Sequence, residues 1–267
     1  MPRVRIVVCV KHVPDIQSER ALGPDRRVVR DGGDGTLNEL DENALEAALS
    51  IAEARGDAEV VVLTVGPDDA VDAVRKGLQM GADEAVHVVD DAIAGSDAVG
   101  TARVLAAAVQ HVGRQTGEVD LVVTGMAGLD GLTSLLPTAL AQLLDVPALP
   151  LAAELTVDGD TVRVRRNLDH ATEVLEASLP ALVSVTDQAN EPRYPNFKGI
   201  MAARKKQVTT LTLADLGLDA SSVGAAGART EVVEAAARPP RENRVLLTDE
   251  GDAGLRLAAY LVEQKLV

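Results

Sequence analysis

The clearest signal of the fold lies in Asp120–Leu144, DLVVTGMAGLDGLTSLLPTALAQLL. Its beginning, Asp120–Thr124, is short and mostly aliphatic, which is typical of a buried strand. A glycine-rich loop, Gly125–Gly131, follows, and Thr133–Leu144 has apolar residues at helical spacing. A strand, a short loop and a helix form part of a βαβ unit, so this stretch predicts a parallel sheet covered by helices.

The same alternation fills the preceding part of the chain. Strands are predicted at Val4–Val10, Glu59–Val65 and Ala85–Val89, and helices at Asp41–Ala54, Asp68–Met80 and Asp97–Gln115. Asn38 or Asp41 is available to cap the first of these helices, and Gly81 is suited to end the second. Lys11–Leu37 is rich in charge and glycine, which predicts a long loop or an irregular hairpin.

The pattern changes after Leu151. Leu155–Val157 and Thr161–Arg165 flank an Asp-Gly-Asp turn and predict a hairpin. Further strands are predicted at Leu182–Val185 and Gln207–Leu213, a linker at Gly217–Arg238 and an amphipathic helix at Asp252–Gln264. We therefore expect a Rossmann-like α/β fold, a mostly parallel sheet flanked by helices, with a β-hairpin insertion. Residues 1–215 would form this domain, and residues 216–267 an extended arm whose helix docks on a partner or packs on its own domain.

The composition narrows the class of protein. The chain has 267 residues, a formal charge of −15, 46% hydrophobic residues, one Phe, two Tyr and no Trp. The core must therefore be aliphatic, and the acidic balance disfavours nucleic-acid binding. The single cysteine, Cys9, excludes an internal disulfide and is expected to be a buried thiol. With no long apolar run and no signal-peptide pattern, we expect no membrane insertion and a cytoplasmic location.

The common catalytic motifs are missing from the sequence. It has no Walker A pattern, no GxGxxG after the first strand, no GxSxG elbow, and its four histidines are scattered. This predicts a binder or carrier whose cofactor supplies the chemistry, without a metal site. The loop Gly125–Gly131 is the candidate ligand site, because small residues allow close approach and the following helix begins with free N–H groups suited to a phosphate. A tight glycine turn is the alternative.

A second unusual stretch is NEPRYPNFKGIMAARKK, residues 190–206. It holds two of the three aromatic residues, Tyr194 and Phe197, and five basic side chains. Its prolines and Gly199 argue against regular structure before Ile200, and a short helix is expected over Ile200–Lys206. Apolar side chains within a basic rim predict a docking surface for an acidic partner. The alternative is that these side chains fill the core.

These motifs carry a resemblance to a known family. The chain resembles the beta subunit of electron transfer flavoprotein, on the NEPRY motif and the Met-Ala-Ala-basic run of residues 190–206. The resemblance extends over essentially the whole chain through further matches, which are Val10–Asp15 (VKHVPD), Asn38–Glu42 (NELDE), Met80–Asp83 (MGAD), the Gly125-x-x-x-x-Asp-Gly131 loop, the run from Val164 to Ser184 and the closing LVEQKLV. His170 and Ala171 depart from the family pattern, where small or acidic residues are usual.

The resemblance implies a heterodimer and an electron carrier, not an enzyme, so no catalytic residue is expected. An alpha subunit would hold most of an FAD on a mobile domain, and the pair would pass electrons from acyl-CoA and other dehydrogenases to a membrane quinone oxidoreductase. The beta subunit of the family also buries a structural AMP. By similarity its contacts are Cys9, Asn38, Glu39, Leu40, Asp41, Val65, Gly125, Met126, Ala127, Gly128, Leu129, Asp130, Gly131, Leu132, Thr133, Ser134, Leu135 and Leu136. The leucines among them can contribute only backbone N–H groups to the phosphate.

The resemblance also assigns surfaces for partners. Phe197 occupies the position of the family's leucine anchor for dehydrogenases, and Glu173 matches a glutamate that contacts the mobile flavin domain. The dehydrogenase-docking residues would be Tyr194, Pro195, Phe197, Ile200 and Met201. Ile16 replaces a tyrosine that lies near the flavin in some relatives, so no flavin contact is expected there.

Two other functions remain open at this point. One is a bifurcating relative with a second FAD in place of AMP, but such relatives tend to have a polar Gln/Thr stretch where this chain has LTSLLP at 132–137. The other is a stand-alone nucleotide-binding protein, stress-protein-like or ATP-pyrophosphatase-like. Those enzymes usually carry an SGGxDS-type loop after the first strand, and this chain has KHVPD at 11–15 instead.

Overall fold

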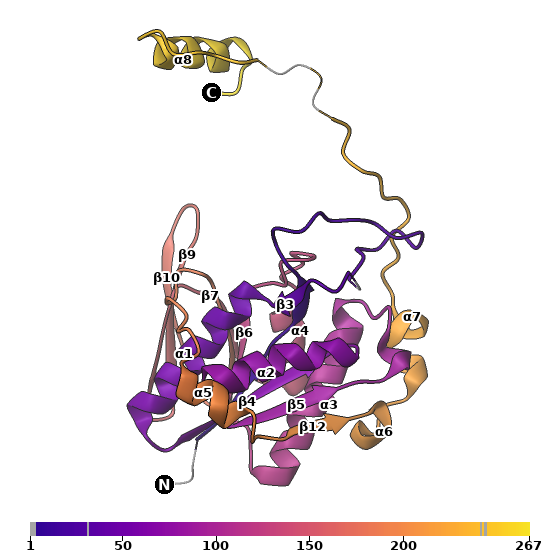
Figure 1. Cartoon of the computed structure of the whole chain (residues 1–267). Coiled ribbons are helices and arrows are strands. Elements are labelled where there is room, and N and C mark those ends of the chain that lie inside the picture. The colour runs from indigo at the N-terminus through magenta and orange to yellow at the C-terminus, as the bar shows by residue number, and fades with distance from the viewer. Residues whose placement is uncertain (1–3, 31, 241, 243–244) are drawn as a thin grey trace. The chain divides into compact units, whose positions relative to one another are not determined.

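The chain forms two compact units, Met1–Val233 and Glu234–Val267 (Figure 1). The computed structural model describes residues 4–30, 32–240, 242 and 245–267. The first unit holds the three sheets and all the helices discussed below except the last. Each unit is described by itself.

The first unit is built on a seven-stranded parallel sheet, as predicted. The strands follow the order β12-β5-β4-β1-β6-β11-β7, and every neighbouring pair is parallel. Their bounds are β1 Val4–Cys9, β4 Ala58–Val65, β5 Glu84–Val88, β6 Leu121–Gly125, β7 Ala148–Ala152, β11 Ala181–Val185 and β12 Val208–Leu211. The central strands are aliphatic on both faces because helices cover both sides. The sequence did not predict β7.

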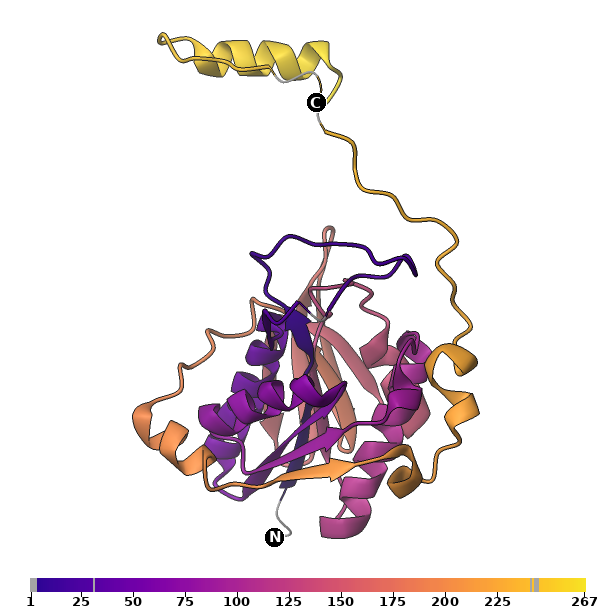
Figure 2. The same ribbon diagram turned by 45° about the vertical axis from the view of Figure 1, so that its right-hand side comes forward.

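Two helical layers enclose this sheet (Figure 2). On one face, α1 (Glu39–Arg55) and α2 (Val71–Met80) share a core with Ile6 and Val8 of β1. On the other face, α3 (Ala98–Thr116) and α4 (Leu136–Leu144) share a second core with Val7 and Cys9. Successive side chains of a strand point to opposite faces, so each central strand contributes to both cores. Short 3₁₀ turns, η1 (Asp68–Ala70) and η2 (Asp91–Ile93), precede α2 and α3.

Two small antiparallel sheets complete the scaffold. The predicted hairpin is β8 (Glu154–Asp158) and β9 (Thr161–Asn167), and β10 (Thr172–Ser178) adds a third strand that the sequence analysis missed. Val162 and Val164 of β9 are fully buried in the core on the α1 side. In the loop after β1, β2 (His12–Pro14) pairs with β3 (Gly35–Leu37), which confirms an irregular hairpin there.

Three predicted boundaries were wrong. The helix α4 begins at Leu136 instead of Thr133, because Leu132 and Ser134 have left-handed backbones with φ of 48° and 52°. The helix α5, Phe197–Ala203, begins three residues before Ile200, because the side chain of Asn196 caps it by accepting from the Gly199 N–H at 2.8 Å.

The expected linker at Gly217–Arg238 is also shorter than predicted. After α6 (Leu213–Leu216), residues 220–227 form η3 (Ala220–Ser222) and α7 (Gly224–Gly227). Val223 between them is fully buried against the core of α3 and α4. This valine and the hydrogen bonds of Gly224 to Ser96 and of Ala225 to Ala94 hold a segment whose Ala, Gly and Ser content suggested a linker.

The second unit, residues 234–267, contains α8 (Ala253–Glu263). None of the described residues of α8 is buried, and Leu255 is 79% exposed. Leu257 and Val262 are exposed on the same helix. No helix in the described part of the chain is both long and apolar enough to cross a lipid bilayer.

Candidate functional site

The first candidate site lies where the strand order reverses. From β1 the chain runs outward to β4 and β5, and it then returns to place β6 on the other side of β1. Open parallel sheets bind ligands beyond the carboxyl ends of the strands at such a switch point. Here Cys9 of β1 pairs with Thr124 of β6, and Gly125 follows directly. The predicted glycine-rich loop therefore starts at the switch point.

Asp41 of α1 joins the two strand ends. Its buried carboxylate accepts hydrogen bonds from the backbone N–H of Lys11, at 2.8 Å, and from that of Gly125, at 3.2 Å. Gly125 is essential to this arrangement, because a Cβ there would lie 2.4 Å from Asp41 Oδ1 and 2.8 Å from the Leu40 carbonyl. Leu40 and Asp41 thus contact the start of the loop, through backbone and carboxylate.

The environment of Asp41 affects two titrating groups. Burial raises the pKa of Asp41 to about 7, although the two backbone N–H groups and Asn38 act to lower it. Burial raises the pKa of the Cys9 thiol to about 12, and the nearby Asp41 carboxylate adds to this shift. Cys9 is therefore a neutral thiol at physiological pH and is not a nucleophile.

Asn38 fixes the conformation of the glycine-rich loop. Its Nδ2 donates to the Ala127 carbonyl, and its Oδ1 accepts from the Leu129 N–H, both at 3.0 Å. Asn38 stands at the N-cap position of α1, but its side chain makes no capping hydrogen bond there. The predicted cap role was therefore wrong, because the same amide satisfies two backbone groups of the loop.

A charge cluster of Lys11, Arg30 and Asp130 lies against the same loop. The Lys11 Nζ lies 2.8 Å from both Asp130 carboxylate oxygens, and the Arg30 Nε lies 2.6 Å from Oδ2. Burial acts to raise the pKa of Asp130, but these two cations hold it below its ordinary value. Two partly exposed cations share one buried carboxylate, so the cluster keeps an excess positive charge beside the loop. This favours an anionic ligand.

The rest of the loop is exposed and leads to the N-terminus of α4. Residues 131–135 are exposed, including Leu132 at 63% and Leu135 at 47%. Left-handed backbones at two non-glycine residues are unfavourable and tend to occur at ligand sites. The N–H groups that open α4, a nine-residue helix, suit a phosphate.

The other predicted ligand contacts are less tightly joined to the loop. Val65 ends β4 on the same sheet edge, half-buried against the core of α3 and α4. Glu39 is exposed in the first turn of α1. Sequence reasoning missed Arg30, which lies 100 residues before its partner Asp130. No local sequence pattern predicts a pairing over this separation.

We predict that Asp41 makes the free energy of unfolding depend on pH. The folded pKa of about 7 exceeds the unfolded value of about 4, so the folded protein binds this proton more tightly. The resulting stabilisation is complete below about pH 4 and is lost as the pH rises through about 7. Asp41→Asn should abolish this dependence. It should also lower the free energy of unfolding by about 1–3 kcal/mol, because an amide has one acceptor oxygen for two N–H donors.

Urea unfolding of the wild type and variant at half-unit steps from pH 5 to 8 measures this. Asp158→Asn, at an exposed position of β8, is the control and should keep the wild-type pH dependence. An unchanged slope in Asp41→Asn would show that another group titrates in this range.

Residues 190–206 form a second surface. Ion pairs and hydrogen bonds hold the first half of this stretch against α1. The Arg193 guanidinium donates to both oxygens of Glu46, at 2.7 Å and 2.9 Å, and also pairs with Glu53. Asn43 and Asn190 exchange hydrogen bonds of 2.9 Å and 3.0 Å. Burial acts to raise the pKa of Glu46, but Arg193 holds it below its ordinary value. The first half of the stretch is therefore rigidly placed, although it has no regular secondary structure.

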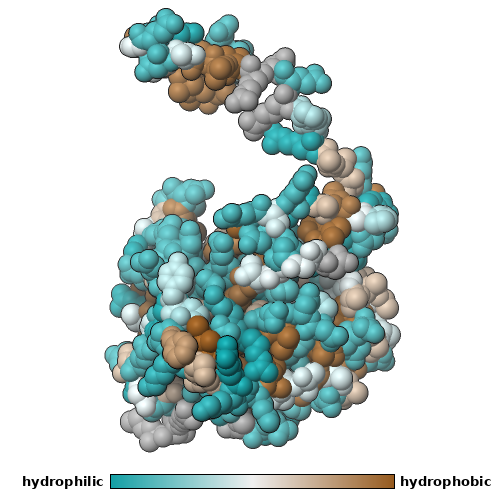
Figure 3. All heavy atoms as spheres, in the orientation of Figure 1, coloured by the Kyte–Doolittle hydropathy of each residue, from teal (hydrophilic) through white to brown (hydrophobic). Residues whose placement is uncertain are grey.

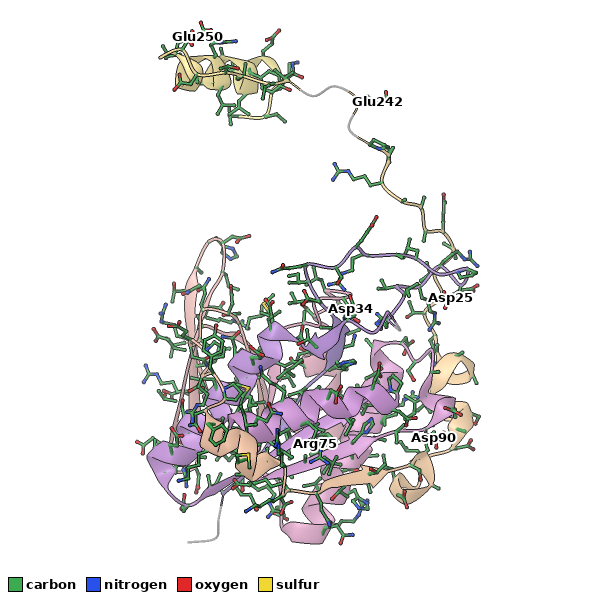
Figure 4. All side chains as sticks on the ribbon, viewed as in Figure 1. Asp25, Asp34, Arg75, Asp90, Glu242 and Glu250 are labelled. Atoms are coloured by element: carbon green, nitrogen blue, oxygen red, sulfur yellow. The ribbon has the colours of Figure 1, made fainter. Side chains whose placement is uncertain are left out.

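The basic residues of this stretch have different roles. Lys206 donates from Nζ to the Ala82 carbonyl at 2.6 Å, and its own carbonyl accepts from Arg75 at 2.8 Å. Figure 4 shows Arg75 on α2 beside α5. Lys206 thus ties α5 to the end of α2, whereas Arg204 and Lys205 are exposed.

The two aromatic residues and Met201 of this stretch are exposed to solvent. Tyr194 is 90% exposed, Phe197 78% and Met201 40%, while Pro195 and Ile200 are half-buried. Figure 3 shows apolar surface at α5 within a hydrophilic surround. The stretch therefore presents its aromatic side chains on the surface and does not use them to fill the core. A cavity of about 160 Å³ beside them is lined by Glu42, Lys76 and Glu191–Pro195.

Glu173 lies on β10. It forms an ion pair with Arg166 of β9, the residue opposite it in the antiparallel register. Its side chain is 38% exposed, so part of it remains accessible to a partner.

Comparison with known proteins places the chain in a family. The model of the electron transfer flavoprotein domain matches residues 26–216. The chain is 42% identical to the electron transfer flavoprotein subunit beta of Mycobacterium leprae (strain TN), over 98% of this chain and 99% of that protein. It is 34% identical to the subunit beta of Megasphaera elsdenii, over 98% and 97% of the two chains. It is also 34% identical to the caffeyl-CoA reductase-Etf complex subunit CarD of Acetobacterium woodii, over 92% of each. The chain belongs to the electron transfer flavoprotein family as a beta subunit, an electron carrier subunit and not an enzyme.

Proposed function

We propose that this chain pairs with an electron transfer flavoprotein alpha subunit, buries one AMP at the switch point, and supports an FAD held mainly by that partner. The observation that carries the AMP site is the loop Gly125–Gly131. It is bonded to Asn38 and Asp41 at the meeting of β1 and β6 and has an excess of positive charge beside it. Neutral Cys9 and aliphatic neighbours suit a nucleoside, and the exposed segment before α4 suits its phosphate.

The AMP has a structural role in this proposal. The chain's own residues bind the nucleotide and keep water from the switch point, while the FAD supplies the electron chemistry. The phosphate would accept from backbone N–H groups of residues 133–136, since the side chains of Leu135 and Leu136 have no polar atoms. Asn38 and Asp41 would hold the loop in place through their hydrogen bonds to its backbone.

The surface around α5 is the proposed dehydrogenase-docking site. Tyr194, Pro195, Phe197, Ile200 and Met201 would contact the partner, and Arg204 and Lys205 would steer an acidic surface toward it. The ion pairs of Arg193 with α1 support this assignment, because a rigid segment loses less entropy on binding. Acyl-CoA dehydrogenases of fatty acid β-oxidation are the proposed donors and a membrane quinone oxidoreductase is the acceptor.

Two further surfaces would contact the alpha subunit. Glu173 is partly exposed on β10 and would meet the mobile flavin domain. The exposed leucines of α8 give the second unit an apolar helix that a partner subunit would cover. A helix of 11 residues is marginally stable alone, so packing of its apolar side chains against the alpha subunit would stabilise it.

The test is the nucleotide content of the purified pair. We would tag this chain, purify it from its own host under mild conditions, and quantify the nucleotides released on denaturation against the two protein bands. The proposal expects one FAD and one AMP per pair. Two FAD and no AMP would instead identify a bifurcating type, and a nucleotide without flavin or second chain would identify a stand-alone binder. Either result would overturn the proposal.

A further inference from the structure

The strands at the switch point change character at their carboxyl ends. On the face covered by α3 and α4, the neighbouring residues Val7, Val122 and Leu182 form an aliphatic row across β1, β6 and β11. Two residues further along each strand, Cys9, Thr124 and Ser184 form the next row on the same face. The second row is small and polar although it is just as buried. Buried polar groups need partners, so this row needs a physical explanation.

Two members of the polar row are accounted for. Cys9 is a neutral thiol, which tolerates an apolar environment. The Ser184 hydroxyl accepts a hydrogen bond of 2.9 Å from the backbone N–H of Leu151. Thr124 is different: it is only 2% exposed, and its Oγ1 has no hydrogen-bond partner among the residues that the structure describes.

We propose that the Thr124 hydroxyl binds the nucleoside part of the nucleotide at the switch point, as a specificity-determining contact. This inference rests on the proposed AMP site. The glycine-rich loop leads from β6 into α4, which covers the face that carries Thr124. A nucleotide whose phosphate lies at the N-terminus of α4 must extend its sugar and base back over the ends of β1 and β6. Thr124 is the residue immediately before the loop on this path.

A hydroxyl suits this contact because it can donate to a purine ring nitrogen or accept from an amino or ribose hydroxyl group. In the nucleotide-free protein the unpaired hydroxyl is unfavourable, and the ligand would remove that penalty. The contact therefore makes the site more stable with nucleotide than without it.

Thr64 offers a matched control within the same sheet. Its buried hydroxyl also has no partner in the described part of the chain. However, Thr64 lies on the same face of β4 as Val60 and Val62, which pack in the core on the α1 and α2 side. Its side chain therefore faces away from α4, and the proposal assigns it no contact with the nucleotide.

The experiment measures AMP and adenosine binding by calorimetry to the full-length chain in complex with its alpha subunit, after the nucleotide at the AMP site is removed. Thr124→Val keeps the shape of the side chain and deletes the hydroxyl. We expect it to weaken AMP and adenosine by the same factor, about 5- to 20-fold. Thr124→Ser should stay within about threefold of the wild type, and Thr64→Val should bind both compounds as the wild type does.

The melting temperature of the nucleotide-free complex provides a second readout. Thr124→Val should not lower it, because no hydrogen bond is lost, but should reduce the rise in melting temperature that AMP produces. Unchanged affinity in Thr124→Val, an equal loss in Thr64→Val, or a loss for AMP without one for adenosine would each overturn the inference. If the wild type itself binds no AMP, the proposed AMP site fails first.

Discussion

Phe197→Ala should raise the dehydrogenase concentration needed for half-maximal electron transfer by about 10- to 100-fold. Phe197 is 78% exposed at the start of α5, on a segment that Arg193 and Asn190 fasten to α1. Burying such a side chain in a partner contributes about 1.5–3 kcal/mol, and 1.4 kcal/mol corresponds to a tenfold change. The rate at saturating dehydrogenase should change little, since the residue is proposed to hold the complex and not to carry electrons.

Steady-state kinetics of flavin reduction by an acyl-CoA dehydrogenase measures this effect. The flavin content and melting temperature of the variant should match the wild type, because an exposed residue contributes little to the fold. Val99→Ala, an exposed apolar residue on α3, is the control and should leave the kinetics unchanged. Wild-type kinetics for Phe197→Ala would show that α5 is not the docking surface.

Gly125→Ala should disrupt the AMP site more severely than an alanine at any other glycine of the loop. The added Cβ would lie 2.4 Å from Asp41 Oδ1 and 2.8 Å from backbone atoms of Leu40. Because the obstruction is partly backbone, the loop must move, which breaks the hydrogen bond from the Gly125 N–H to Asp41. We expect the free energy of unfolding to fall by about 1–3 kcal/mol and AMP affinity to fall more than about tenfold.

Gly131→Ala is the matched control in the same loop. A Cβ there would meet nothing closer than Thr133 Oγ1 at 3.6 Å, an ordinary contact, and the backbone N–H is retained. Unfolding curves and AMP calorimetry on both variants separate the two positions. If Gly131→Ala were as damaging as Gly125→Ala, general loop stiffness, and not the close approach of Leu40 and Asp41, would explain the glycines.

Much of the fold could be predicted because its signals are local. Each aliphatic run before a glycine-containing loop and a helical pattern became a strand of the parallel sheet, as in β1, β4 and β6. The strand β7 was missed because Pro150 interrupts its short sequence, ALPLA. The strand β10, TEVLEAS, has the polar and apolar alternation of a half-buried strand, so its sequence carried a signal that was missed.

The candidate sites were predictable only in part. The loop itself was visible in its glycines, and the surface around α5 in its scarce aromatic residues. The partners that hold them were not, because Asp130 pairs with Arg30 and Arg193 with Glu46 across more than 90 residues. The start of α5 was also missed, since Asn196 could have been a loop residue as well as a cap. Long-range pairing of charges depends on the folded topology and leaves no local pattern.

The most direct test of the proposed carrier function is whether the flavin of the purified pair accepts electrons from a dehydrogenase. The complex would be mixed anaerobically with catalytic acyl-CoA dehydrogenase and excess acyl-CoA, and the flavin absorbance followed. We expect complete loss of the oxidised flavin band. The loss should require the dehydrogenase, and at limiting dehydrogenase concentrations it should be slower in Phe197→Ala. A flavin that stays oxidised with active dehydrogenases would contradict the proposal that this chain docks them and supports electron transfer.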